Sequence, residues 1–190
     1  MTSDERDIVL NHLRVTGNDL LQKIDPRLIP GPGLPLGYAL KGARDSSGVA
    51  GFRIYVPDNP GQERTSPGVF GAEPDISRII ITAMRFDPKI RSAAIIRCTK
   101  PVCLLAENLF FEVATFDAAK EPPGTGTQDW GVASCCGREG VPVVIANNPA
   151  PGKPAYLRFL GESPENVATN ILMLSNRVIN IEIQDRSEWE

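Results

Sequence analysis

The chain has 190 residues, a length that suits one well-packed domain and is short for two. Apolar residues make up 42% and charged residues 23%, which allows a full hydrophobic core and argues against wholesale disorder. The net charge of −3 provides no general positive field for nucleic acid or anionic membranes. No apolar run approaches the ~18 residues of a membrane span, and the N-terminal MTSDERD lacks the apolar core of a secretion signal. We therefore expect one cytoplasmic domain over residues 1–190, with no direct nucleic-acid or membrane partner.

The first expected element is a helix within residues 1–27, capped by Thr2 or Ser3 and ended by Pro26. Gly17 is the position where this helix could break. Residues 30–50 are rich in proline and glycine, so we expect an ordered loop that enters a strand at 52–56. Residues 57–72 would form a second long loop, either a lid over a binding site or plain surface disorder.

Helices and strands alternate through the rest of the chain. The expected helices are 74–85, 100–108, 128–136 and one whose cap is Ser163 and whose first residue is Pro164. The expected strands are 93–98, 111–115, 142–146 and 156–160, followed by an edge strand at 178–183. This alternation predicts a layered α/β domain.

The four cysteines contain no C-x-x-C pair, and we expect them to be reduced, buried or half-buried thiols: Cys98, Cys103, Cys135 and Cys136. His12 is the only histidine, so neither a zinc site nor a three-histidine metal site is expected. The same scarcity excludes a Ser–His–Asp relay unless His12 is its base.

Basic residues concentrate between positions 78 and 100, a segment that contains six lysines and arginines but one acidic residue. Most of them are expected to lie on a solvated helix face. Arg97 differs because it ends the apolar strand AAIIRC, and ligand sites of α/β sheets gather at the carboxyl ends of strands. Arg53, Lys153, Arg158 and the Gly-rich turn 124–127 add further elements suited to an anion. Together they predict a site for a phosphorylated small molecule.

Five segments resemble the sequence pattern of the ThiN family, the archaeal-type thiamine-phosphate synthase domain. FGAEPDISRIIITAMRFDPKIRSAAIIRCTK is similar to FGASSHVAR followed by an apolar helix and MKFDPxIRAAMNIRYS. Upstream, IPGPGLPLGYALKGARD resembles IPEVGSNIGYALPGAKD. Downstream, ATFDAAKEP, GTGTQDWG and VVIANNPAPGKPAYLRFLGESPENV resemble SSFDRxEEP, EGSTLEWG and DVIYDxGGxGKEPMIRVLGRxPEEV. The resemblance covers roughly residues 28–178.

The resemblance implies a three-layer α/β/α domain with a mixed sheet, similar to class II sugar-phosphate aldolases. It also implies an activity, the joining of hydroxymethylpyrimidine diphosphate to thiazole phosphate with release of pyrophosphate. The product would be thiamine phosphate, Mg²⁺ would accompany the diphosphate, and the domain would form a homodimer.

Residue by residue, the resemblance assigns roles to positions of this chain. Arg53 falls where the family has an arginine associated with catalysis. Arg97 matches the arginine of NIRYS and Lys153 the lysine of GKEP, both as phosphate ligands. Asp117 matches the aspartate of SFD, and Thr127 matches the threonine of GST.

Several polar positions of the pattern are replaced. Asp75 stands where the family has the histidine of SSHVAR, and Asn147 stands where it has the aspartate of IYD. Ile95 and Cys98 replace the asparagine and the tyrosine of NIRYS. If the histidine donates to the departing phosphates, Asp75 opposes them by about 1 to 4 kcal/mol at ~4 Å. If the histidine is a base, Asp75 could take its place.

Two functions therefore stay open. The first is a thiamine-phosphate synthase with an altered site, in which Arg53 and Asp75 are catalytic. The second is a non-catalytic sensor domain that binds thiamine phosphate and acts through a partner protein, because residues 1–27 are too few for a helix-turn-helix module. A sugar-phosphate aldolase, the third alternative, lacks its metal ligands.

Overall fold

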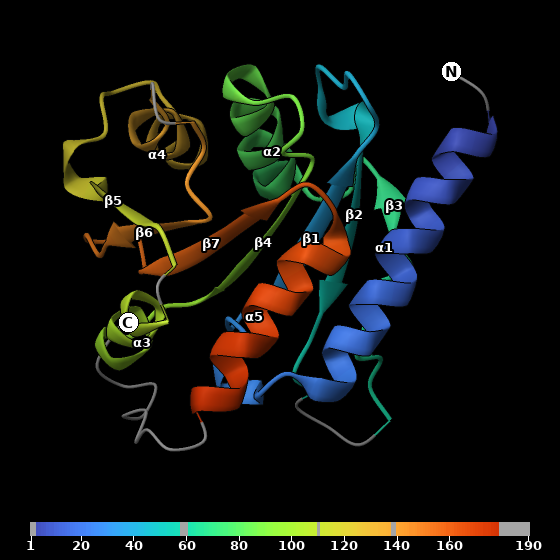
Figure 1. Ribbon diagram of the computed structural model, residues 1–190, viewed down its shortest axis with the longest axis horizontal. Coiled ribbons are helices and arrows are strands. Elements are labelled where there is room, and N and C mark those ends of the chain that lie inside the picture. The colour runs from blue at the N-terminus through green and yellow to red at the C-terminus, as the bar shows by residue number, and fades with distance from the viewer. Residues whose placement is uncertain (1–2, 58–60, 110, 138–139, 179–190) are drawn as a thin grey trace.

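The computed structural model describes residues 3–57, 61–109, 111–137 and 140–178. They form three layers, with a sheet between two sets of helices (Figure 1). On one face lie α1 (Ser3–Lys23), α3 (Lys100–Asn108) and α5 (Pro164–Val178), and on the other lie α2 (Pro74–Phe86) and α4 (Thr127–Cys135). Within the described ranges, no helix is long and apolar enough to cross a bilayer.

In the described part of the chain, the sheet has seven strands in the order β3-β2-β1-β4-β7-β6-β5. Their bounds are β1 (Leu34–Ala39), β2 (Val49–Ile54), β3 (Val69–Phe70), β4 (Ser92–Arg97), β5 (Val113–Asp117), β6 (Val144–Asn148) and β7 (Tyr156–Gly161). Among the described strands only β5 and β6 pair in parallel, so the sheet is mixed. The expected three-layer α/β/α architecture is confirmed.

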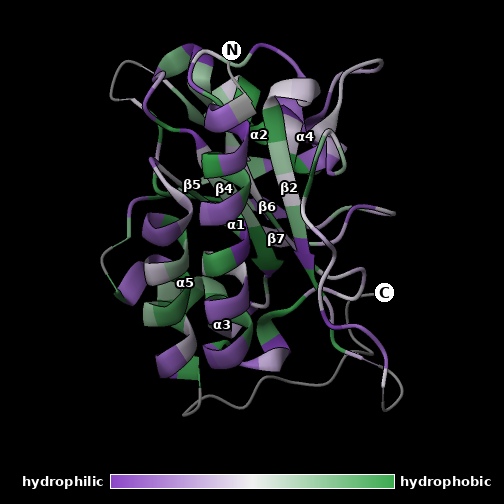
Figure 2. Ribbon diagram, turned by 90° about the vertical axis from the view of Figure 1, so that its right-hand side faces the viewer, coloured by the Kyte–Doolittle hydropathy of each residue, from purple (hydrophilic) through white to green (hydrophobic). Residues whose placement is uncertain are grey.

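Alternation along each strand divides the core between the two faces. On β7, Leu157 and Phe159 pack toward α1 and α5, while Leu160 packs toward α2 and α4. Figure 2 shows β2 mostly in green, whereas α1 changes between green and purple along its length. This is the pattern of a helix that covers the sheet with one side only.

One strand corrects the expectation for residues 30–50, because β1 lies inside them and pairs with both β2 and β4. Leu34 and Leu36 are fully buried on the α1 side. On the opposite side Gly37 leaves room for α2, since a Cβ there would lie 2.4 Å from Ile76. Pro35 pairs only with Arg53 of β2, before the pairing with β4 begins. The glycine and the proline that suggested a loop are therefore compatible with a strand. Gly37 allows α2 to pack closely, and Pro35 lies where hydrogen bonding to β4 has not yet begun.

Helix α1 runs unbroken through Gly17, where we expected that it could break. The ring of Phe52 occupies the space that a side chain would need, because a Cβ on Gly17 would lie 2.4 Å from it. The segment 57–72 is not wholly structureless, since β3 lies within it and pairs with β2. The expected edge strand at 178–183 falls outside the described residues, apart from Val178 at the end of α5.

The expectation of four reduced cysteines is wrong for one pair, because Cys98 and Cys103 form a disulfide. Cys98 follows β4 and Cys103 lies in the first turns of α3, which brings their Cα atoms to 6.2 Å. That separation is within the range that a disulfide spans. Cys135 and Cys136 are free thiols, as expected.

An ion pair at the end of α1 predicts how stability depends on pH. Arg27 donates hydrogen bonds to the Asp25 carboxylate at 2.7 and 3.0 Å, and this lowers the pKa of Asp25 below 3.8. A lowered carboxyl pKa stabilises the fold above the unfolded-state value and ceases to do so as the pH falls through the folded-state value. Asp25→Asn keeps a side-chain oxygen that can accept the hydrogen bond from the Arg27 backbone N–H. It should therefore lower the free energy of unfolding by only about 1 kcal/mol at pH 7. Urea unfolding at neutral pH and below about pH 4 tests this, and a pH-independent cost would contradict it.

Candidate functional site

The functional side chains gather at one end of the sheet. The strand directions place the carboxyl ends of β2, β4, β5 and β6 there, together with the starts of β1 and β7. A cleft of about 550 Å³ opens at this end, lined by Ile29, Pro30, Gly31, Pro32, Arg97, Cys98, Pro149, Ala150, Pro151, Gly152, Lys153, Pro154, Ala155 and Tyr156. Its walls are thus two proline- and glycine-rich loops, and Arg97, Lys153 and Tyr156 contribute polar or charged groups. The described residues of the proposed lid at 57–72 do not line the cleft.

Arg97 is half-buried at the last position of β4 and lies directly opposite Tyr156 on β7. Among the described residues, the Arg97 guanidinium forms no hydrogen bond or ion pair. Burial raises the pKa of Tyr156, with Arg158 and Arg53 acting in the opposite direction, so the phenol stays protonated at neutral pH. The predicted phosphate ligand Arg97 is therefore available to an anion.

Lys153 and Thr127 meet through a residue that the sequence did not single out. Both the Lys153 ammonium and the Thr127 hydroxyl donate to Glu121 at 2.5 Å. These two hydrogen bonds lower the pKa of Glu121, and Lys153 has the larger effect. The charge of Lys153 is consequently neutralised within the chain.

Arg53 supports one wall of the cleft through hydrogen bonds. Its Nε donates to Glu73 at 2.9 Å, a second nitrogen also contacts that carboxylate, and Nη1 donates to the carbonyl of Pro32 at 2.8 Å. Glu73 raises the pKa of Arg53, which keeps the guanidinium charged. The structure thus places Arg53 behind the loop 30–32, paired with Glu73 just ahead of α2.

Asn147 belongs to a buried network around Arg158. Its Oδ1 accepts from Arg158 Nη1 and from the Tyr156 backbone N–H, both at 3.0 Å. Arg158 Nε donates to Gln128 Oε1 at 2.8 Å, at the start of α4. Arg158 is only 1% exposed, and burial lowers its pKa to about 10, so it remains a cation at neutral pH. Asn147 therefore acts inside the protein, where it holds the start of β7.

Asp75 is exposed in the first turn of α2 and forms no hydrogen bond within the described residues. Its charge nevertheless acts on the pKa values of Arg53, Tyr156 and Arg158, which places it on the same side of the sheet as these residues. The position predicted as catalytic therefore adds a negative charge near the site.

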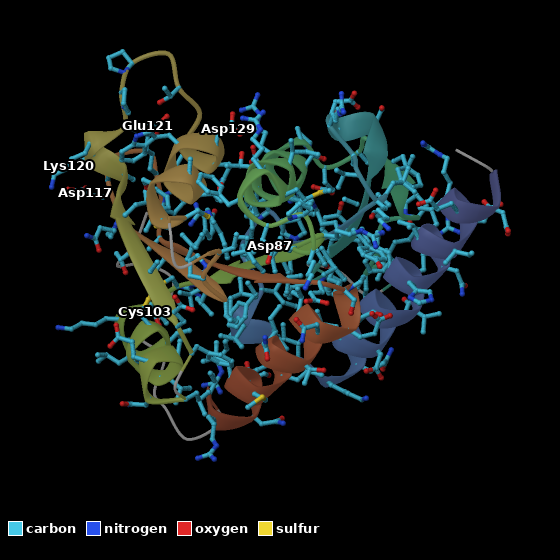
Figure 3. All side chains as sticks on the ribbon, turned by 45° about the horizontal axis from the view of Figure 1, so that its top comes forward. Asp87, Cys103, Asp117, Lys120, Glu121 and Asp129 are labelled. Atoms are coloured by element: carbon cyan, nitrogen blue, oxygen red, sulfur yellow. A yellow bond between two sulfur atoms is a disulfide. The ribbon has the colours of Figure 1, made fainter. Side chains whose placement is uncertain are left out.

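Asp117, like the predicted residues Arg53, Asp75, Thr127 and Asn147, is not among the residues that line the cleft. It ends β5, accepts a hydrogen bond from the Ala119 N–H at 3.0 Å and pairs with Lys120 at 3.6 Å. Figure 3 shows Asp117, Lys120 and Glu121 together where β5 ends. Asp117 caps the short turn Ala118–Lys120 that carries Glu121 toward Lys153.

Sequence reasoning assigned no role to Tyr156, Gln128, Glu73 or Glu121. It counted Arg158 among the elements suited to an anion, whereas the structure buries this residue against Gln128 and Asn147. One signal for Arg158 was available, because a lone charge within YLRFLG interrupts an otherwise apolar strand. The acidic partners carried no such signal, since their roles depend on contacts across the fold. Among the described residues, no group of three or more His, Cys, Asp or Glu side chains could hold a metal ion.

Comparisons with known proteins identify the family and the fold. The family model for thiamine-phosphate synthase ThiN matches residues 15–173. The bifunctional thiamine biosynthesis protein ThiDN of Methanocaldococcus jannaschii is 31% identical over 155 residues, which cover 80% of this chain and 37% of that protein. The match thus spans little more than a third of this relative's length.

Solved structures show the same fold. The C-terminal domain of protein MJ0236 superposes with a TM-score of 0.82 and 28% identity over 90% of this chain and 95% of that one. The C-terminal domain of a phosphomethylpyrimidine kinase gives 0.79 and 26%, over 90% of this chain and 100% of that one. YgbL of Escherichia coli, an aldolase/epimerase/decarboxylase-like protein, gives 0.55 at 11% identity over 99% and 94%, a likeness in fold alone.

Proposed function

Because the chain belongs to the ThiN family, we propose that it makes thiamine phosphate from hydroxymethylpyrimidine diphosphate and thiazole phosphate. The observation that carries this proposal is Arg97, a cation without a counter-charge among the described residues, at the end of a central strand and in the wall of the cleft. Such a group suits a phosphate ligand, since arginine pairs its N–H donors with phosphate oxygens.

The reaction defines what the site must do. The bond between the pyrimidine methylene carbon and the diphosphate oxygen breaks, and pyrophosphate leaves with the electron pair. The thiazole nitrogen supplies the electron pair of the new C–N bond. Fixed positive charge lowers the barrier by stabilising the leaving pyrophosphate. Arg97 would supply that charge, and Mg²⁺ would enter with the diphosphate as part of the substrate.

A non-catalytic domain that binds thiamine phosphate is the second candidate, and the position of Asp75 favours it. An exposed carboxylate at the start of α2 opposes an approaching diphosphate more than it opposes a monophosphate. In this alternative the cleft holds thiamine phosphate without making it. A homodimer is an additional expectation for either function.

One assay tests both functions. The purified protein, mixed with both phosphorylated precursors and Mg²⁺, should form thiamine phosphate and pyrophosphate in equal amounts, measured by chromatography. Omitting the thiazole phosphate is the control. No product, together with thermal stabilisation by thiamine phosphate, would overturn the synthase and support the binding domain. Absence of both product and binding would overturn both functions.

A further inference from the structure

The basic side chains at this end of the sheet differ in whether they already have partners within the chain. Arg53 pairs with Glu73, and Lys153 pairs with Glu121. Arg158 is enclosed and directs two of its nitrogens at Gln128 and Asn147. In the described part of the chain, Arg97 is the cleft-lining basic residue that remains without a partner. An anion in the cleft therefore meets Arg97 as its available charged donor.

Tyr156 lies beside Arg97 in a way that the strand register dictates. The two residues are direct partners in the antiparallel β4–β7 pair, so their side chains leave the sheet on the same face. The Cβ atoms of such partners are about 5 Å apart. Both residues line the cleft. The Tyr156 hydroxyl makes no hydrogen bond to any described residue, although its backbone N–H is held by Asn147.

The surroundings of Tyr156 keep it in place and neutral. Its backbone is fixed by Asn147 Oδ1, which Arg158 in turn holds at 3.0 Å. The ring packs partly against the core between the sheet and α2 and α4. Burial raises the pKa of the phenol, so it carries a proton to donate at neutral pH. The hydroxyl is thus a positioned donor with no acceptor from the described residues.

We propose that Arg97 and Tyr156 form a clamp for a phosphoryl group, in which the guanidinium and the phenol O–H donate to oxygens of the same phosphate. The identity of the phosphorylated ligand rests on the proposed function, whereas the clamp itself requires only a phosphate or diphosphate anion. Tyr156 is then a ligand-binding residue that neither the family match nor the sequence pattern assigned. The other residues that line the cleft are mostly prolines, glycines and apolar residues, which suit the apolar part of the ligand.

Calorimetric titration with inorganic pyrophosphate tests the clamp without requiring catalysis. Tyr156→Phe removes only the hydroxyl and should weaken binding about tenfold, as expected for the loss of one hydrogen bond to a charged group. Tyr38→Phe is the matched control, because Tyr38 lies on β1 near the opposite end of the sheet, beside Arg91, and should bind like the wild type. Since the phenol stays protonated, the tenfold ratio should hold from about pH 6 to about pH 9.

Two further measurements separate the clamp from a structural role. The melting temperature of Tyr156→Phe should match that of the wild type, and the losses in Tyr156→Phe and Arg97→Gln should not add in the double variant. Wild-type affinity in Tyr156→Phe, additive losses, or no pyrophosphate binding by the wild type would each overturn the clamp. If pyrophosphate binds as expected but the two precursors yield no thiamine phosphate and thiamine phosphate does not stabilise the protein, the clamp stands and the proposed function fails.

Discussion

Arg158→Ala should lower the free energy of unfolding by about 3 kcal/mol, the cost of replacing a large buried side chain with a small one. Among the described residues, Arg158 is the largest side chain that is fully buried. Its loss leaves a cavity beside Phe116, over whose ring the guanidinium lies at 5.2 Å, and deprives Gln128 Oε1 of its donor. Urea denaturation would measure the change, and the melting temperature should fall by roughly 6 to 12 °C for a domain of this size.

Arg158→Met separates the volume of Arg158 from its charge. It keeps most of the volume and removes a buried cation that has no carboxylate partner among the described residues. Because burying a charge is itself costly, Arg158→Met should destabilise less than Arg158→Ala. Arg85→Ala, at an exposed position of α2, is the surface control and should change stability by less than about 0.5 kcal/mol. Equal losses in Arg158→Ala and Arg85→Ala would contradict the structural role of Arg158.

Arg97→Gln should lower kcat/KM for thiamine-phosphate formation about 100-fold, which corresponds to about 2.7 kcal/mol of transition-state stabilisation. The reason is that pyrophosphate gains negative charge as it leaves, and Arg97 is the unpaired cation in the described cleft wall. The effect should appear mainly in kcat, since the charge develops in the transition state. Steady-state rates of pyrophosphate release measure it.

Two companion variants sharpen this prediction. Arg97→Lys keeps the charge but not the paired donors, so it should recover only part of the rate. Arg85→Gln removes one positive charge from an exposed position on α2 and should leave the rate unchanged. If Arg97→Gln and Arg85→Gln behave alike, Arg97 does not contact the leaving group.

Most helices and strands could be predicted because their apolar spacing reports directly on the face that they bury. The range expected for the helix at 100–108 coincides with α3, and the expected strand at 156–160 is β7 to within one residue. β1 was not predicted because its proline and its glycine are typical of loops. Their true role is set by neighbours, since Gly37 admits Ile76 and Pro35 lies where the ladder with β4 has not begun.

The candidate site also combines features that the sequence could predict with features that depend on contacts across the fold. Arg97 could be selected because a basic residue ends an apolar strand, and the structure places it in the cleft. Lys153 also lies there, but its pairing with Glu121 could not be foreseen, because the two are 32 residues apart. Asp117 was chosen by resemblance alone; the structure shows that it caps a turn, and its role in binding stays a prediction.

The sequence by itself determined the layered α/β class and the family, because both follow from the order and spacing of residue types along the chain. Only the tertiary structure decided which polar groups remain available to a ligand. Arg53, Lys153 and Arg158 are all basic residues near the same end of the sheet, yet each is held by partners from other elements. Arg97 and Tyr156 are left available because antiparallel pairing sets them side by side at the cleft, with no described side chain bonded to either.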